Sequence, residues 1–169
     1  MYKIKLVFDS DALIKLVKAG FPKEIFKNFN AYIPNEVYNE VVTKGKYGLF
    51  EDAFTIENII NEGLLRKKKS GFDLKIRRLL ESTNLGKGEK SALHLFREIK
   101  ASAIISDDHQ FLTFLHKNKM PFITPADLVI RLNKVNLIDY KESVKILEGL
   151  KLFIKDEQYK NFKKQLKGE

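Results

Sequence analysis

Residues 4–17, IKLVFDSDALIKLV, decide the fold class. The apolar run over residues 4–8, interrupted only by Lys5, predicts a strand that is buried on both faces. The pair Asp9-Ser10 is a favourable helix cap, and the apolar residues after it recur with a helical period until Gly20. A buried strand that leads directly into a helix is the repeating unit of α/β proteins. We therefore expect a parallel sheet covered by helices on both faces.

Further short apolar segments extend this pattern along the chain. The additional predicted strands are residues 31–33, 103–105 and 122–123, with a weaker candidate at 64–65. The predicted helices that follow them include residues 35–42, 50–60, 72–80, 89–99, 126–132, 140–150 and 156–166. We expect a three-layer α/β/α architecture with a central, mainly parallel sheet. Residues 1–135 are predicted to form the sheet-containing domain, and residues 136–169 a C-terminal helical extension packed on that domain.

The composition narrows the classes of partner and site. The chain has 31 Lys+Arg and 22 Asp+Glu among 169 residues, for a net charge of +9. This excess predicts a polyanionic partner such as nucleic acid, although a lysine-rich surface in a heat-adapted protein gives the same balance. The absence of cysteine excludes disulfides, thiolate zinc sites and thiol nucleophiles. No apolar run approaches the ~20 residues of a membrane span, and no signal-peptide pattern is present, so we expect a cytoplasmic protein outside the membrane.

Carboxylates follow two of the predicted strands. Asp9 comes directly after the first strand, and Asp107-Asp108 follow residues 103–105. Because the carboxyl ends of parallel strands meet at one edge of the sheet, we expect these acids to lie together. Glu40 and Glu89, on a helix and at a helix start, are placed to join them. Such a cluster is unfavourable unless a cation neutralises it, and Mg²⁺ or Mn²⁺ prefers oxygen ligands. A simple helix-capping role also remains open for each acid taken alone.

Four segments in order resemble the PIN-domain ribonucleases, whose fold is shared by the VapC-type toxins. They are VFDSDALI (7–14), IPNEVYNEVV (33–42), LGKGEKSAL (85–93) and IISDDHQF (104–111). The first resembles the opening strand and its acid, and the second is similar to P-x-x-V-x-x-E-V. The third is similar to G-x-G-E-x-x-A, and the fourth to a strand that ends in Thr/Ser-x-Asp-x-x-Phe. The resemblance covers about residues 4 to 130, and it implies the PIN-like fold.

The resemblance also implies a function. It predicts a metal-dependent endoribonuclease with catalytic residues Asp9, Glu40, Glu89 and Asp108, and products that carry a 5′-phosphate and a 3′-hydroxyl. Asp9, Glu89 and Asp108 are the expected ligands of Mg²⁺ or Mn²⁺, which would activate water and stabilise charge on the phosphoryl group. Ser106 is a candidate to orient a neighbouring carboxylate or to contact the phosphate, with a simple turn role as the alternative.

Three acids have open roles. Asp11 stands where the family commonly carries a small polar residue, so it is either a further ligand or an ordinary helix residue. Glu36 lies one turn before Glu40 on the predicted helix and competes with it. Asp107 competes with Asp108, which the family pattern favours.

A block of basic residues and the family resemblance suggest binding partners for the chain. Residues 64–78 carry seven cationic residues and one acid, and Lys67, Lys68 and Lys69 within them are the predicted substrate-binding residues for an RNA backbone. A solvated surface is the alternative interpretation of this block. The resemblance further implies a small antitoxin protein and a homodimer.

Two other functions remain open at this point. One is a catalytically silent PIN-like protein that binds RNA or acts as a scaffold. The other is a haloacid-dehalogenase-type phosphatase, because Asp9-Ser10-Asp11 fits the D-x-D opening of that class. That motif requires Thr or Val where Leu13 stands, and it leaves Glu40 and Glu89 unexplained.

Overall fold

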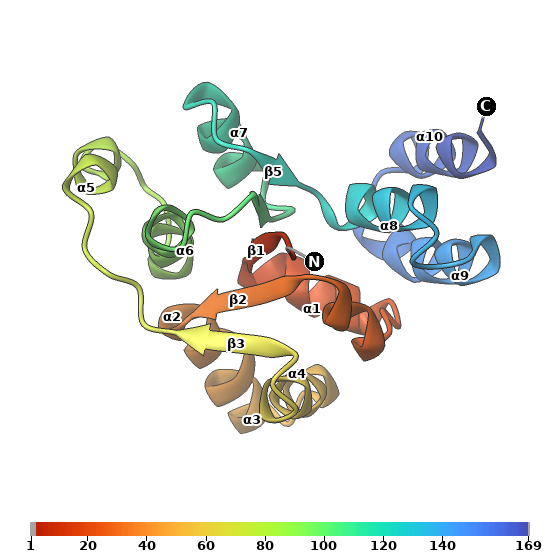
Figure 1. Ribbon diagram of the computed structural model, residues 1–169, viewed down its shortest axis with the longest axis horizontal. Coiled ribbons are helices and arrows are strands. Elements are labelled where there is room, and N and C mark those ends of the chain that lie inside the picture. The colour runs from red at the N-terminus through yellow and green to blue at the C-terminus, as the bar shows by residue number, and fades with distance from the viewer. Residues whose placement is uncertain (1–2, 169) are drawn as a thin grey trace.

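The computed structural model describes residues 3–168, and within them five strands form one sheet. The strands are β1 (Lys5–Phe8), β2 (Asn30–Pro34), β3 (Leu65–Lys68), β4 (Ala103–Ile105) and β5 (Phe122–Ile123). Their order is β3-β2-β1-β4-β5, and every neighbouring pair is parallel. Helices cover both faces (Figure 1), which confirms the predicted three-layer α/β/α fold.

The alternation of side chains along β1 separates two hydrophobic cores. Leu6 and Phe8 point into the larger core, whereas Val7 points into the smaller one with Ile104 of β4. The larger core is covered by α1 (Ser10–Lys18), η1 (Lys23–Asn28), α4 (Glu51–Asn61), α8 (Pro125–Lys134), α9 (Tyr140–Leu150) and α10 (Asp156–Lys167). The smaller core is covered by α5 (Leu74–Leu80), α6 (Lys87–Glu98) and α7 (His109–Lys117). Because successive strand residues face opposite sides, an almost uninterrupted apolar strand supplies both cores.

The segment after β2 departs from the expected single helix over residues 35–42. It consists of α2 (Asn35–Tyr38), a π-helical turn, η2 (Asn39–Lys44), and the short α3 (Gly45–Tyr47). Both Val41 and Val42 are buried in the larger core. Such π-helical turns are frequent at functional sites, and this one carries Glu40.

The C-terminal helices continue the larger core. Helices α9 and α10 pack on α8, and buried residues such as Leu147, Tyr159 and Leu166 belong to the same cluster as the strands. The domain boundary that we predict after residue 135 falls just past the end of α8 and stays a prediction. The outer ends of the two predicted ranges, residues 1–2 and 169, lie outside the described residues. In the part of the chain that is described, no helix has the length and apolar character needed to span a membrane.

Candidate active site

The topology places one crevice at the carboxyl edge of the sheet. From β1 the chain adds β2 and β3 on one side, and it later adds β4 and β5 on the other. The connections after β1 and β4 therefore diverge, which makes the tips of these adjacent strands the switch point where α/β proteins bind ligands. Asp9 follows β1 and Ser106 follows β4, and the Asp9 amide donates a hydrogen bond to the Ile105 carbonyl at 2.9 Å.

Asp9 lies at the centre of this crevice and is only 4 % exposed. One carboxylate oxygen accepts a hydrogen bond from the Ser106 hydroxyl at 2.9 Å, and the other accepts one from the Ser10 amide at 2.8 Å. The pKa of Asp9 is raised to about 6, mainly by burial and also by the charges of Asp11 and Glu40, against the effect of these hydrogen bonds. Ser106 thus orients Asp9.

Glu40 reaches the crevice from the π-helical turn. Its carboxylate accepts a hydrogen bond from the Ser10 hydroxyl, next to Asp9. It also lies against the first turn of α6, because a Cβ placed on Gly88 would be 2.7 Å from its Oε2. Through this contact, the segment that carries Glu40 (residues 33–42) lies against the segment that carries Glu89 (residues 85–93).

Glu89 and Asp108 complete the group. The Gly86 amide donates a hydrogen bond to Glu89 Oε2 at 2.6 Å, and the Phe111 amide donates one to Asp108 Oδ1 at 2.7 Å. Burial raises the pKa of Glu89, and the charges of Asp9 and Asp108 add to this effect against the Gly86 hydrogen bond. We refer to Asp9, Glu40, Glu89 and Asp108 as the acid cluster. The structure therefore brings together the four acids that the sequence predicts to be catalytic.

Two of the acids with open roles are paired with a lysine. Lys15 of α1 lies 2.6 Å from Asp11 and 2.8 Å from Asp107. Burial acts to lower the pKa of Lys15, but its hydrogen bonds to Asp107 and Asp11 outweigh burial and raise it. Sequence analysis missed Lys15, although its position four residues after Asp11 is a standard helical ion-pair spacing. Lys15 thus offsets part of the negative charge of these two acids.

Glu36 is the third acid whose role the sequence leaves open. Its Oε2 is buried, and within residues 3–168 it has no hydrogen-bond partner. A buried carboxylate oxygen without a donor is costly, so a cation or a water molecule is the natural partner for this atom.

The donor set of the acid cluster suits a hard divalent cation. It offers only carboxylate oxygens, and the raised pKa values of Asp9 and Glu89 reflect burial and repulsion that such a cation would relieve. Among the described residues, no group of three or more His, Asp or Glu side chains is already arranged to hold a metal ion. The oxygens of Asp9, Glu89 and Asp108 instead accept hydrogen bonds from the protein. A cation would have to compete with these contacts.

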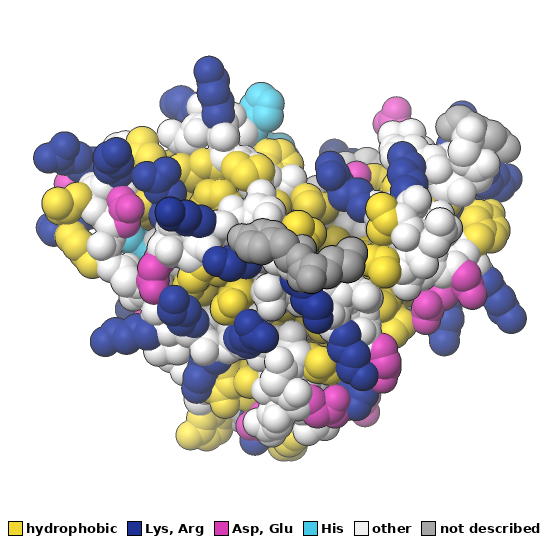
Figure 2. Space-filling model, in the orientation of Figure 1, with side chains coloured by type: hydrophobic (Ala, Val, Ile, Leu, Met, Phe, Trp, Pro, Cys, Tyr) yellow, Lys and Arg dark blue, Asp and Glu magenta, His cyan; other side chains and the backbone are white. Residues whose placement is uncertain are grey.

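The predicted substrate-binding lysines lie at the end of β3 and just after it. The ammonium of Lys67 lies over the Tyr38 ring, 3.9 Å from its centroid, and Lys68 pairs with Glu98 at 2.9 Å. Lys69 is exposed. Figure 2 shows that lysine and arginine side chains gather on the part of the surface formed by β3, α5 and α6. We call Arg66, Lys67, Lys69, Arg77 and Arg78 the basic strip.

Comparison with known proteins identifies the family. A family model described as a PIN domain matches residues 5–168. The chain belongs to the PIN-domain family. This match confirms the resemblance seen in four short segments and extends over the C-terminal helices. A search of curated proteins and a search of solved structures each found no match. The PIN domain is a nuclease-like fold, and in this PIN domain the acid cluster occupies the switch point of the sheet.

Proposed function

We propose that this PIN domain is a metal-dependent endoribonuclease that hydrolyses RNA phosphodiester bonds at the acid cluster. The observation that carries the proposal is the convergence of four carboxylates, from four separate segments, on the tips of β1 and β4. A chain with a net charge of +9 gains no stability from gathering these acids, because burial and repulsion already raise the pKa of Asp9 to about 6. Such a site is favourable when it binds a cation.

The residues of this chain supply the arrangement for the reaction. Asp9, Glu89 and Asp108 would hold Mg²⁺ or Mn²⁺, with Glu40 beside them. When bound, the metal lowers the pKa of a water molecule and stabilises the charge that develops on the phosphoryl oxygens. Ser10 donates to both neighbouring acids, through its amide to Asp9 and through its hydroxyl to Glu40, so it holds two carboxylates at one place.

The charge distribution supports RNA as the substrate. The basic strip supplies cations for the phosphate backbone, and Arg66 and Lys67 lie against the rings of Tyr32 and Tyr38. Phosphate contacts provide affinity that does not depend on sequence.

The test compares the same substitution at two aspartates that each cap a helix. Asp108→Asn removes a charge from the acid cluster, whereas Asp139→Asn changes the cap of α9, where Asp139 accepts the Glu142 amide at the same distance of 2.7 Å. Asparagine is an equally good helix cap, so both variants should fold. We expect at least a hundredfold slower cleavage of labelled RNA with Mg²⁺ or Mn²⁺ for Asp108→Asn, and wild-type cleavage for Asp139→Asn.

The same assay separates the alternatives. If wild-type protein binds RNA but never cleaves it with either metal, the PIN domain is a silent RNA-binding protein. If it instead hydrolyses a small phosphomonoester, the phosphatase hypothesis replaces ours. Full cleavage by both Asp108→Asn and Asp9→Asn would show that the acid cluster is not the active site.

The proposal includes a cellular setting. We place the nuclease in the cytoplasm, as the toxin of a toxin–antitoxin pair that is restrained by a small antitoxin and forms a homodimer. The family resemblance supports this role, and so does an exposed apolar surface on η3 (Lys151–Phe153), where Leu152 is 87 % exposed. Sedimentation of the purified chain, and growth of cells that express it with and without Asp108→Asn, test the homodimer and the toxicity. Unchanged growth and a monomer would leave a nuclease without a toxin role.

A further inference from the structure

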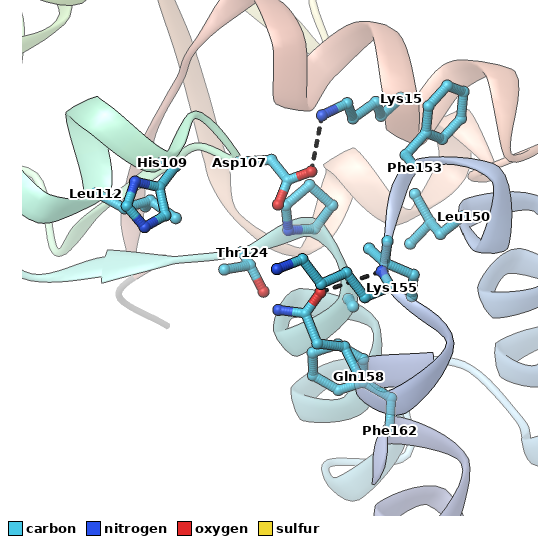
Figure 3. A pocket seen from close by; sticks show the side chains of 13 residues that line it. Lys15, Asp107, His109, Leu112, Thr124, Leu150, Phe153, Lys155, Gln158 and Phe162 are labelled. Atoms are coloured by element: carbon cyan, nitrogen blue, oxygen red, sulfur yellow. Dashed lines mark hydrogen bonds and ion pairs between the residues drawn. The ribbon is translucent and has the colours of Figure 1, made fainter. Parts of the chain in front are cut away.

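A pocket opens beside the acid cluster, between α7, α8 and the start of α10 (Figure 3). Its volume is about 470 Å³, within the usual range for small-molecule sites. Asp107 lines the pocket, and the next residue, Asp108, belongs to the acid cluster. Because Asp107 pairs with Lys15 and directly follows Ser106 at the end of β4, the pocket opens at the same edge of the sheet as the acid cluster. We call it the α10 pocket.

The walls of the α10 pocket combine apolar and cationic groups. Leu112, Leu150, Phe153 and Phe162 supply apolar surface, and Phe153 is 36 % exposed. Charged and polar groups line the rest, namely Lys15 paired with Asp107, together with His109, Lys155 and Gln158. Lys15 is already paired with Asp107, and its ammonium lies 5.8 Å from the centroid of the Phe153 ring. Lys155 is exposed and forms no ion pair among the described residues, so it is the cation that the anionic phosphate of a nucleotide would pair with, while the flat base suits the apolar wall.

The Gln158 amide has a defined orientation. Its Oε1 accepts a hydrogen bond from the Lys155 backbone amide at 3.2 Å, which caps the first turn of α10. Since the oxygen must face that amide, the Nε2 group points elsewhere. Figure 3 shows Nε2 beside the Lys155 ammonium, and both groups are directed into the pocket toward Thr124. Gln158 is exposed, so its Nε2 group, which has no protein acceptor among the described residues, is open to solvent and to a ligand in the pocket.

We infer that the α10 pocket binds one nucleotide of single-stranded RNA next to the bond that is cut. The base lies against Phe153 and Phe162, the Gln158 Nε2 group donates to an acceptor on the edge of the base, and the Lys155 ammonium contacts a phosphate. This inference rests on the proposed function and adds to it a site for base recognition. A base with an acceptor at the matching position is favoured, because a base that presents a donor there leaves the amide unpaired.

Two matched substitutions on α10 test the contact. Gln158→Glu keeps the oxygen that caps the helix, and glutamate is a preferred residue at this third helical position. It removes the Nε2 donor and places a negative charge in the pocket. Gln165→Glu makes the same chemical and charge change on the same helix, at a residue that does not line the pocket.

The probes are the four nucleoside 5′-monophosphates and four pentanucleotide RNAs that differ only in their central base. Affinity is measured with EDTA present, from the backbone amide signals of Lys155 and Gln158 in nuclear magnetic resonance titrations. We expect saturable shifts with a preference among the four bases. Gln158→Glu should weaken binding of the preferred base about tenfold, whereas Gln165→Glu should match the wild type. Phe153→Leu should weaken the binding of all four bases to the same extent, because stacking on an aromatic ring depends little on which base is present.

The outcomes separate this inference from the proposed function. If no probe shifts the pocket signals, or if Gln158→Glu and Gln165→Glu bind alike, the inference is wrong even when wild-type protein cleaves RNA. If only a copurifying protein shifts these signals, the pocket is a protein-docking site and the inference is again wrong. If nucleotides bind through Gln158 but no RNA is cleaved, the pocket stands and the nuclease proposal fails.

Discussion

At the scale of single residues, Asp9 shows how hydrogen bonding and burial act against each other on the charge of one carboxylate. Its carboxylate accepts hydrogen bonds from Ser10 and Ser106, yet burial still raises its pKa to about 6. The folded protein thus holds an ionised group where ionisation is unfavourable. Such a residue lowers stability in the absence of a cation and gains a favourable partner when a cation binds.

The pH dependence of Asp9→Asn measures this cost. The carboxyl ionises near 3.8 in the unfolded chain and near 6 in the folded protein, so its penalty is absent below about pH 4 and complete above about pH 6. Without divalent metal, Asp9→Asn should raise the free energy of unfolding by about 2–3 kcal/mol at pH 8, with no gain near pH 4. Urea unfolding at both pH values tests this. Asp139→Asn should follow the wild type, and an Asp9→Asn protein that is less stable at pH 8 would contradict the burial penalty.

Residue spacing reveals the four acids but not their surroundings. Asp9, Glu89 and Asp108 can be found because each follows a strand or starts a helix within a short pattern, and Glu40 because it falls in the P-x-x-V-x-x-E-V segment. Lys15 could not be assigned a role, because its contact with Asp107 spans 92 residues of sequence. The pairing of Lys15 with Asp107 depends on how α1 packs beside the end of β4. No local pattern reports such packing.

At the scale of elements, the contact between the π-helical turn and α6 positions Glu40. Gly88 is buried at the start of α6, and the carboxylate of Glu40 occupies the space that a Cβ would need. Glycine at this position therefore has a steric reason rather than a conformational one.

Replacement of two neighbouring glycines tests that contact. Gly88→Ala places a Cβ 2.7 Å from Glu40 Oε2 and should displace the carboxylate, so we expect cleavage to fall about tenfold or more. Its stability should change by no more than about 1 kcal/mol, because alanine is the better helix former. In Gly86→Ala the new Cβ meets only Glu89 Oε2, at an ordinary 3.5 Å, and activity should be retained. Equal activity of the two variants would show that the position of Glu40 is unimportant.

The first and last residues of a helix or strand could be predicted where a regular pattern of apolar residues starts and stops clearly. The predicted helix over residues 140–150 coincides with α9, and the predicted strand over 103–105 coincides with β4. The π-helical turn within residues 35–42 could not be anticipated. The valines that it buries fit the apolar pattern of an α-helix equally well, and only packing against the rest of the larger core distinguishes the two.

At the scale of the whole molecule, positive charge lies outside the crevice and negative charge inside it. Within the basic strip, Lys67 and Lys69 lie at the carboxyl end of β3 and just after it, while the acid cluster occupies the tips of β1 and β4. An RNA strand that is attracted by the strip meets the acids only with a cation between them. This arrangement links substrate binding to metal binding through electrostatics.

The dependence of RNA binding on salt tests the strip. Replacing Lys67, Lys68 and Lys69 with alanine should weaken the binding of unrelated RNAs to the same extent. It should also reduce the slope of log K against log salt by about 1–2, since each phosphate contact on a single strand contributes about 0.7. Lys68 should contribute least, because it pairs with Glu98. The control replaces Lys134, Lys141 and Lys145, three exposed lysines on α8 and α9, with alanine. Equal slopes for the two triple variants would place the RNA elsewhere.

The hydrogen bond between Ser106 and Asp9 joins residues 97 positions apart. During protein synthesis, a ribosome-bound chain that already contains β1, β2 and β3 has no β4 beside Asp9. Asp9 then lacks the Ser106 hydroxyl, and neither Asp108 nor the α10 pocket has been formed. The chain therefore acquires its catalytic arrangement only after most of its length has left the exit tunnel. Under the proposed ribonuclease function, the order in which the sheet is built would keep the nascent chain inactive while it is still close to ribosomal RNA.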